Sequence, residues 1–203
     1  EAPTISRMTC PLFRGSHRFY GGHAMAFFDI PADEELSPEV RQLLEEYGRL
    51  IGRGQAPPTW RAFGRSPKII EARVKAYQNL NYVSKFPWDA RNLAVMLIAH
   101  TKRCRGCFAA SRFDLEKLGF DEATLDGICA NPEALPLRER DRLFVHYALK
   151  IATGSADLQP KDFREMAEHG FSKEEIQEII AFAAYWTMNM VFTQSANAAL
   201  ADE

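Results

Sequence analysis

Apolar residues recur every three or four positions along most of the chain after residue 36, which is the period of helices with one buried face. The clearest stretch opens at Ser37-Pro38-Glu39, an N-cap residue followed by a first-turn proline and an acidic residue. Gly52 and Gly54 end the run. The apolar positions between them are Val40, Leu43, Leu44, Tyr47, Leu50 and Ile51. We therefore predict a helix over 38–51.

Comparable start and stop signals predict further helices along the rest of the chain. The last long one opens at Ser172-Lys173-Glu174-Glu175, a capping box. Alternation of apolar and polar residues with a period of two is absent, so we predict no strands and an all-α fold. The other predicted helices begin near Ser66-Pro67, Pro87, Cys104, Asp121, residue 137 and Pro160.

The first 36 residues lack a sustained period and are broken by proline and glycine, so we predict an extended arm over 1–36 and a helical domain over 37–203. Because this arm is rich in phenylalanine, we expect it to lie on its own body or on a neighbouring subunit. A weak repeat of helix order between 38–84 and 137–195 suggests a duplicated unit, and chance similarity of helix caps is the alternative.

Composition narrows the class of protein. The chain has 203 residues and a formal net charge of −2, which gives no overall field that would attract nucleic acid or acidic lipid. No apolar run is long enough to span a bilayer, so we expect no transmembrane segment. We expect a cytoplasmic location, or a periplasmic or secreted one if Glu1 is a processed terminus.

The four cysteines include one pair, Cys104 and Cys107, with the spacing of a redox-active dithiol. The thiolate is the nucleophilic form, and helix N-termini and nearby cations favour it. Lys102, Arg103 and Arg105 supply those cations, and a helix starting near Cys104 would add the field of its N-terminus. Spacing and charge together indicate thiol redox chemistry.

His100 lies four residues before Cys104, so on an unbroken helix it would share a face with both cysteines and with Ser111. It could then act as a base for a thiol. The alternative is a histidine at a helix end, turned away by a break near Lys102.

Two other readings of the cysteines remain. A Cys-x-x-Cys pair is half of a zinc site, but the sequence has no second pair to complete it, and both cysteines could also be inert core residues. Cys10, His17 and His23 form a weaker candidate metal site in the arm. We expect no metal and no bound cofactor.

From about Ser37 to Leu200 the sequence resembles the alkylhydroperoxidase D-like and carboxymuconolactone decarboxylase family. The resemblance rests on helix order, on Arg91-Asn92-Leu93 twelve residues before the Cys-x-x-Cys pair, on Leu118-Gly119-Phe120, and on Tyr185-Trp186-x-Met188-Asn189. It implies an all-α helical bundle, usually assembled as a homo-oligomer, commonly a trimer or hexamer, without a resident metal or flavin.

The resemblance also implies site roles. Cys107 would be the attacking thiolate and Cys104 the resolving thiol, with a separate thiol partner reducing the disulfide. Family members carry Glu where Asn92 stands and His where Ser111 stands, and those two residues form the proton relay. Asn and Ser cannot carry a proton at neutral pH as Glu and His do. Either His100 replaces this relay, or peroxide reduction is weak or lost, whereas dithiol–disulfide exchange needs no relay.

These observations favour a thiol-dependent oxidoreductase that reduces hydroperoxides or exchanges disulfides. The alternative is a helical scaffold or accessory subunit of a larger assembly that has lost activity. A decarboxylase-like enzyme acting on a small acid through His100 or His146 ranks lowest, because the spacing supplies no acid–base pair.

Overall fold

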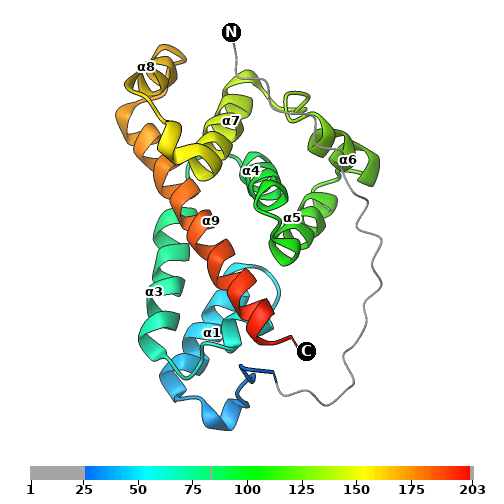
Figure 1. Cartoon of the computed structure of the whole chain (residues 1–203), viewed down its shortest axis with the longest axis vertical. Helices are drawn as coiled ribbons and strands as arrows, with labels where there is room; N and C mark the ends of the chain where they lie inside the picture. Colours follow the sequence, from blue (N-terminus) through cyan, green and yellow to red (C-terminus); the bar gives the residue numbers. More distant parts are fainter. Residues whose placement is uncertain (1–25, 83, 202–203) are drawn as a thin grey trace.

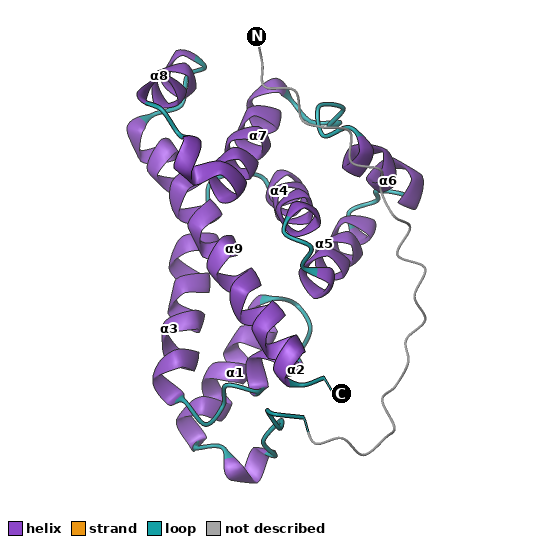
Figure 2. Cartoon of the chain, in the orientation of Figure 1, coloured by secondary structure: helices purple, strands orange, loops and turns teal. Residues whose placement is uncertain are grey.

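Helices are the only regular secondary structure in this computed structural model, which describes residues 26–82 and 84–201 (Figure 2). The prediction of an all-α fold is confirmed. Three short turns accompany the helices: η1 (Asp33–Glu35), the π-helical turn η2 (Gln78–Tyr82) and η3 (Ser155–Asp157). The helices are α1 (Pro38–Leu50), α2 (Pro58–Arg61), α3 (Pro67–Tyr77), α4 (Trp88–Thr101), α5 (Arg105–Lys117), α6 (Glu122–Ala130), α7 (Glu139–Gly154), α8 (Pro160–Glu168) and α9 (Lys173–Ala199).

The predicted caps begin their helices as expected. The hydroxyl of Ser37 accepts a hydrogen bond from the Val40 amide at 3.3 Å. At the start of α9, Ser172 and Glu175 form the predicted reciprocal capping box, with bonds of 3.2 and 2.9 Å. Each such bond satisfies an amide that would otherwise lack a partner in the first turn.

Two apolar clusters form the core, and α9 belongs to both. One cluster joins α1, α2 and α3, and the other joins helices α4 to α9. Tyr185 is buried in the first cluster, Phe182 and Met190 are buried in the second, and Trp186 packs against both. The long last helix therefore runs diagonally through the molecule and connects its two halves (Figure 1).

The described part of the arm lies on the body of the same chain. The Phe28 amide donates to the Ala199 carbonyl at 2.8 Å, and the Phe28 ring lies 5.9 Å from that of Phe63. Arg65 pairs with Asp29 at 2.5 Å and with Glu35 at 2.6 Å. Residues 1–25 lie outside the described residues, and the predicted boundary at 36/37 stays a prediction.

A tight turn separates α4 from α5. The Cys104 amide donates to Ala99 at 2.9 Å and the Arg103 amide donates to His100 at 3.1 Å, which is the bonding of a Schellman motif. Arg103 takes the left-handed conformation, with a φ of 57°. The helical path therefore breaks at this turn, and α5 starts in a new direction at Cys104.

The loop between α1 and α2 folds back closely over α1. A Cβ atom on Gly48 would lie 2.6 Å from the backbone of Gln55, so glycine permits this approach. Gly52 and Gly54 adopt φ values of +67° and +74°, conformations that favour glycine. We call residues 51–57 the cover loop, because they form one side of the cavity described below.

The predicted repeat appears in the order of elements. Helices α1, α2 and α3 run long, short and long, as do α7, α8 and α9. The two glycines at matching places differ, because Gly170 has a φ of +84° whereas Gly64 is buried against the side chain of Leu36. Duplication of the unit stays a prediction.

Candidate active site around Cys107

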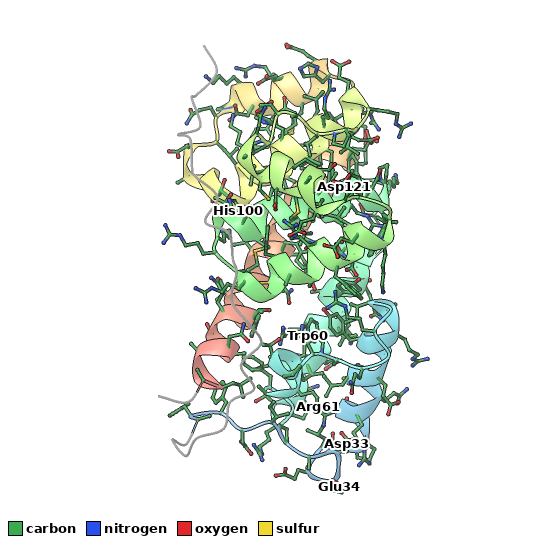
Figure 3. All side chains as sticks on the ribbon, turned by 90° about the vertical axis from the view of Figure 1, so that its right-hand side faces the viewer. Asp33, Glu34, Trp60, Arg61, His100 and Asp121 are labelled. Carbon is green, nitrogen blue, oxygen red and sulfur yellow. A yellow bond between two sulfur atoms is a disulfide. The ribbon has the colours of Figure 1, made fainter. Side chains whose placement is uncertain are left out.

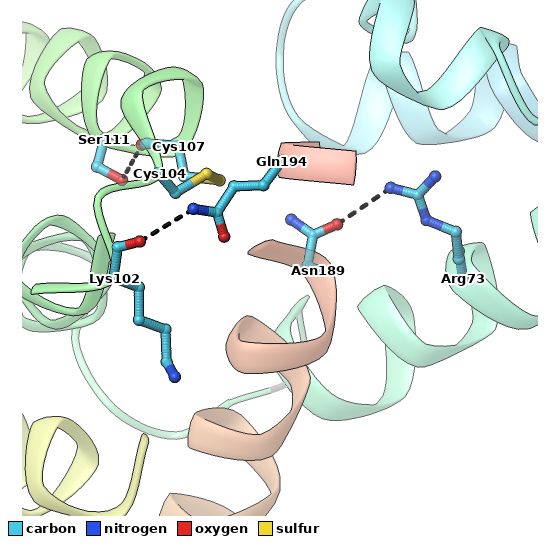
Figure 4. Close-up of a disulfide and its surroundings, with 7 residues drawn as sticks. All are labelled: Arg73, Lys102, Cys104, Cys107, Ser111, Asn189 and Gln194. Carbon is cyan, nitrogen blue, oxygen red and sulfur yellow. Dashed lines mark hydrogen bonds between the residues drawn. A yellow bond between two sulfur atoms is a disulfide. The ribbon is translucent and has the colours of Figure 1, made fainter. Parts of the chain in front are cut away.

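The two cysteines of the pair occupy the first turn of α5. Cys104 is the N-cap residue and Cys107 lies three positions later, with 5.4 Å between their Cα atoms and a disulfide joining them (Figure 4). The predicted helix start at Cys104 is confirmed. The unpaired amides of this first turn create a positive potential that favours the thiolate form of a nearby cysteine.

The two sulfurs differ in access. Cys104 has no exposed surface, and Cys107 is 7% exposed. A cavity of about 280 Å³ lies where the two apolar clusters meet, and Cys107 lines it whereas Cys104 does not. Its walls come from the end of α1, the cover loop, α2, the α3–η2 junction, α4, α5 and α9. A reactant in this cavity can therefore contact Cys107, whereas Cys104 is reached only through Cys107.

The two residues at the relay positions of the resemblance, Asn92 and Ser111, also line the cavity. Both are buried, at 8% and 4% exposure. The Asn92 amide nitrogen donates to the Trp88 carbonyl at 2.9 Å, and the Ser111 hydroxyl donates to the Cys107 carbonyl at 3.0 Å. The structure therefore brings these residues together with Cys107, but each of them bonds to its own helix.

Arg91 contributes a cation to the same wall. Its Nη1 donates to the backbone oxygen of Asn81 in η2 at 2.5 Å, and its guanidinium carbon lies 4.6 Å from the ring centre of Trp88. The side-chain oxygen of Asn81 accepts from the Trp186 indole at 2.9 Å. The π-helical turn thus orients both a cation and an aromatic wall, a role that the sequence pattern did not indicate.

Arg53 of the cover loop closes one side of the cavity against α5. Its Nη2 donates to the Ala110 carbonyl at 3.2 Å and lies 3.4 Å from the Asp114 carboxylate. Both charged side chains are partly exposed, at 30% and 26%. This ion pair holds the cover loop on α5.

Arg73 lies behind the cavity wall in an aromatic cage. Its guanidinium carbon is 3.9 Å from the ring centre of Trp60 and 4.5 Å from that of Phe192. Its Nη2 donates to Asn189, which lines the cavity and lies between Arg73 and the cysteine pair in Figure 4, at 3.3 Å. Burial lowers the pKa of Arg73 to about 10, so the guanidinium stays charged at neutral pH.

His100 does not line the cavity. It lies in the last turn of α4, ahead of the turn at Arg103, and its ring lies 5.6 Å from that of Phe108. In Figure 3 it lies well away from Trp60, a residue of the cavity wall. Of the cations named from the sequence, Arg103 and Arg105 are exposed and Lys102 is partly buried. The backbone carbonyl of Lys102 accepts a hydrogen bond from the Gln194 side chain at 3.0 Å.

The remaining candidate residues lie elsewhere. His146 borders a separate cavity of about 290 Å³, where its Nδ1 is 4.0 Å from Glu133. Cys10, His17 and His23 lie outside the described residues. Within residues 26–82 and 84–201, no group of three or more His, Cys, Asp or Glu side chains is placed to hold a metal ion. In the same ranges no helix is long and apolar enough to cross a membrane.

Comparisons with known proteins identify the fold. No family model and no curated protein matches the sequence. The alkylhydroperoxidase AhpD core of Ralstonia eutropha JMP134, an uncharacterized peroxidase-related protein, superimposes with a TM-score of 0.71 at 20% identity, covering 90% of this chain and 94% of that one. A peroxidase-related protein from Silicibacter sp. TM1040 gives 0.69 at 19% identity, with 88% and 92% covered.

A third solved structure widens the chemistry found on this fold. It is a cysteine-to-alanine variant of the debrominase Bmp8 in complex with 2,3,4-tribromopyrrole, with a TM-score of 0.62 at 15% identity, covering 81% of this chain and 86% of that one. The expected alkylhydroperoxidase D-like fold is confirmed, and the fold by itself does not select one reaction.

Proposed function

We propose that this chain, which has the fold of the alkylhydroperoxidase AhpD core, is a thiol-dependent oxidoreductase acting through Cys107 and Cys104. The observation that carries the proposal is the unequal access of the two sulfurs. Cys107 lines the cavity at a helix N-terminus, and Cys104 is sealed behind it within disulfide distance. An attacking thiol needs access to the reactant, whereas a resolving thiol needs access only to its partner.

The reaction that we propose proceeds in three steps. The Cys107 thiolate attacks the outer oxygen of a hydroperoxide, an S–O bond forms as the O–O bond breaks, and the departing alkoxide takes a proton from water. The Cys104 thiol then attacks the sulfenic acid, which forms the disulfide and releases water. A dithiol partner reduces the disulfide by exchange and becomes a disulfide itself. If the oxidant is a small disulfide, the first step gives a mixed disulfide and a free thiol instead.

The polar neighbours of Cys107 favour the exchange reaction over rapid peroxide turnover. Asn92 and Ser111 both bond to their own helix and neither carries a proton at neutral pH. Loss of a general base costs roughly 10²–10⁴-fold in rate. We propose no proton transfer through His100, because it lies outside the cavity wall.

The two alternatives have less support. An inactive scaffold does not account for a cavity formed where the two apolar clusters meet, with the accessible cysteine on its wall. A decarboxylase-like reaction through His100 or His146 lacks an acid–base pair at one cavity, since His100 lines neither cavity and His146 borders the other one.

A thiol count tests the proposal. The fully reduced chain is treated with one equivalent of cumene hydroperoxide, and free thiols are titrated before and after. We expect the loss of two thiols and a peptide linked through Cys104 and Cys107 in mass spectra. The variant Cys129→Ser serves as the control and should lose the same two thiols. If neither the peroxide nor a small disulfide consumes this pair, the proposal is wrong.

We also propose that the chain forms a homo-oligomer through α9. Ile180, Met188 and Val191 are exposed on this helix at 38%, 37% and 59%, with spacings that place them along one side. Exposed apolar side chains in such a row favour a contact with another subunit. Sedimentation at micromolar concentration should show a trimer or a hexamer, and a monomer would contradict this.

A further inference from the structure

We propose that the cavity at Cys107 takes a single-ring organic substrate carrying a carboxylate, which Arg91 binds while the tryptophans hold the ring. This inference rests on the proposed function for the reaction at sulfur, but the binding itself does not depend on it. The class of substrate is thus an acidic aromatic hydroperoxide or disulfide rather than a neutral or lipid one.

The first argument is the charge of the cavity wall. Its charged side chains are Arg53, Asp114 and Arg91, and the first two pair with each other at 3.4 Å. Arg91 is 9% exposed. Among the described residues, 26–82 and 84–201, it takes part in no ion pair. A buried cation without a counter-ion favours an anion in the adjoining space.

The second argument is the state of the guanidinium itself. Nη1 is bonded to Asn81, whereas Nε is buried without a hydrogen-bond partner in the described part of the chain. Burial lowers the pKa of Arg91, and Tyr77 and Glu178 offset only part of this effect. A carboxylate pairs with guanidinium through two parallel N–H donors. Arg91 keeps Nε unused and has no carboxylate partner, whereas Arg53 is already paired with Asp114.

A second cation adds to this field from behind the wall. Arg73 is 2% exposed and is surrounded by Trp60, Phe63 and Phe192, with no carboxylate pair among the described residues. It bonds to the Oδ1 atom of Asn189 and so leaves the amide nitrogen of Asn189, a donor, on the cavity side of the pair. The positive potential of the site therefore exceeds that of Arg91 alone.

The third argument is the shape of the apolar walls. All three tryptophans of the chain, Trp60, Trp88 and Trp186, line this cavity. Two of them are fixed, because the Trp60 ring stacks on Tyr47 at 3.5 Å and the Trp186 indole bonds to Asn81. Flat, fixed walls favour a flat ligand. A volume of about 280 Å³ lies at the small end of ligand pockets, roughly 300–1,000 Å³, so one ring fits and a lipid chain does not.

A binding experiment separates this inference from the proposed function. The full chain in its disulfide form is titrated with 4-isopropylbenzoate and with the neutral analogue 4-isopropylbenzamide, using tryptophan fluorescence. Neither probe has an O–O bond, and the disulfide form cannot react, so peroxidase activity plays no part. We expect the acid to bind about ten-fold more tightly than the amide, as a charged hydrogen bond of about 1.4 kcal/mol would give.

Variants then assign the preference to Arg91. Arg91→Gln should bring the ratio of the two dissociation constants near one, and Arg91→Lys, which keeps the charge and loses the fork, should give an intermediate ratio. Arg164→Gln removes the same charge from an exposed site on α8 and should leave the ratio unchanged. Equal binding of both probes, binding of neither, or a preference that survives in both Arg91 variants would overturn the inference.

Discussion

The hydroxyl of Ser111 donates to the backbone oxygen of Cys107 at 3.0 Å, so this side chain, one helical turn after the cysteine, is bonded within its own helix. Asn92 is tied in the same way, through its amide nitrogen, to the Trp88 carbonyl. Neither residue bridges α4 and α5. A proton relay between these helices therefore needs side chains that reach across the cavity.

Restoring the relay should accelerate peroxide reduction. In the double variant Asn92→Glu/Ser111→His, an imidazole next to Cys107 can accept its proton and a carboxylate can orient the imidazole. We expect kcat/KM for cumene hydroperoxide to rise by about 10²-fold, measured with a coupled dithiol assay. Each single variant should gain much less, because a lone buried carboxylate or imidazole lacks its partner. An unchanged rate in the double variant would contradict the relay as the missing element.

The two single serine variants should give different products with peroxide. In Cys104→Ser, peroxide should leave a sulfenic acid on Cys107, because the resolving thiol is gone. In Cys107→Ser, the sealed Cys104 should stay unmodified. Mass spectra after treatment with dimedone, which labels sulfenic acids, measure both results. Labelling of Cys104 in preference to Cys107 would reverse the roles proposed here.

His100 should contribute little to turnover. It does not line the cavity, it precedes the turn at Arg103, and its ring packs beside that of Phe108. We expect His100→Gln to keep kcat/KM within about two-fold of the parent, since loss of a true general base costs roughly 10²-fold or more. A loss of that size, with an unchanged melting temperature, would return His100 to the mechanism.

Asp162 should make stability depend on acid pH. It is 1% exposed, Lys150 donates to it at 2.7 Å and the Gln159 amide donates at 2.9 Å. The bond from Lys150 is the main reason that the pKa of Asp162 lies below its usual value of 3.8. The carboxylate therefore stabilises the fold above that pH, and the contribution is lost as the pH falls below it.

The variant Asp162→Asn tests whether the stabilisation by this carboxylate is lost as the pH falls. Melting temperatures of the parent and the variant should differ clearly at pH 7 and converge toward pH 3, measured by circular dichroism. Glu71→Gln is a useful control, because its lowered pKa comes from exposed lysines, whose pairing contributes little. A difference that stays constant from pH 7 to pH 3 would show that Asp162 acts through packing rather than charge.

Arg103→Gly should stabilise the protein. A side chain in the left-handed conformation is strained by roughly 1–2 kcal/mol, and glycine removes that strain at some cost in the entropy of the unfolded chain. We expect a net gain of about 1 kcal/mol, or a melting temperature raised by about 2–4 °C. The neighbouring variant Lys102→Gly, at a φ of −82°, should lower the melting temperature instead. If both glycines destabilise, the turn is not strained.

The helices were accessible from the sequence because their signals are local. Ser37 and Ser172 cap the helices that they were predicted to cap, and apolar spacing marked the buried faces between them. The four-residue α2 was anticipated only as the short helix of the weak repeat, without bounds, and the π-helical turn η2 was missed, since each is too short to show a period. Part of the site followed from the Cys-x-x-Cys spacing and the family resemblance.

The cavity itself could not be predicted in the same way. Its walls come from segments far apart along the chain, such as Trp60, Arg91 and Asn189, and no local pattern says which faces will meet. Arg91 was noted only as part of a sequence motif, although its burial outside any ion pair is the feature on which the proposed carboxylate ligand depends. A role for His100 required an unbroken helix, and the left-handed residue at 103 breaks that path, which is the alternative that placed a break near Lys102.

Because α9 is one uninterrupted helix shared by both apolar clusters, the halves of the molecule cannot swing apart about a hinge without bending it. One side of the cavity is formed by the cover loop, which the pair of Arg53 and Asp114 joins to α5. Because both side chains of this pair are partly exposed, added salt should weaken it, so the cover loop is the part of the cavity wall whose contact with α5 depends on ionic strength.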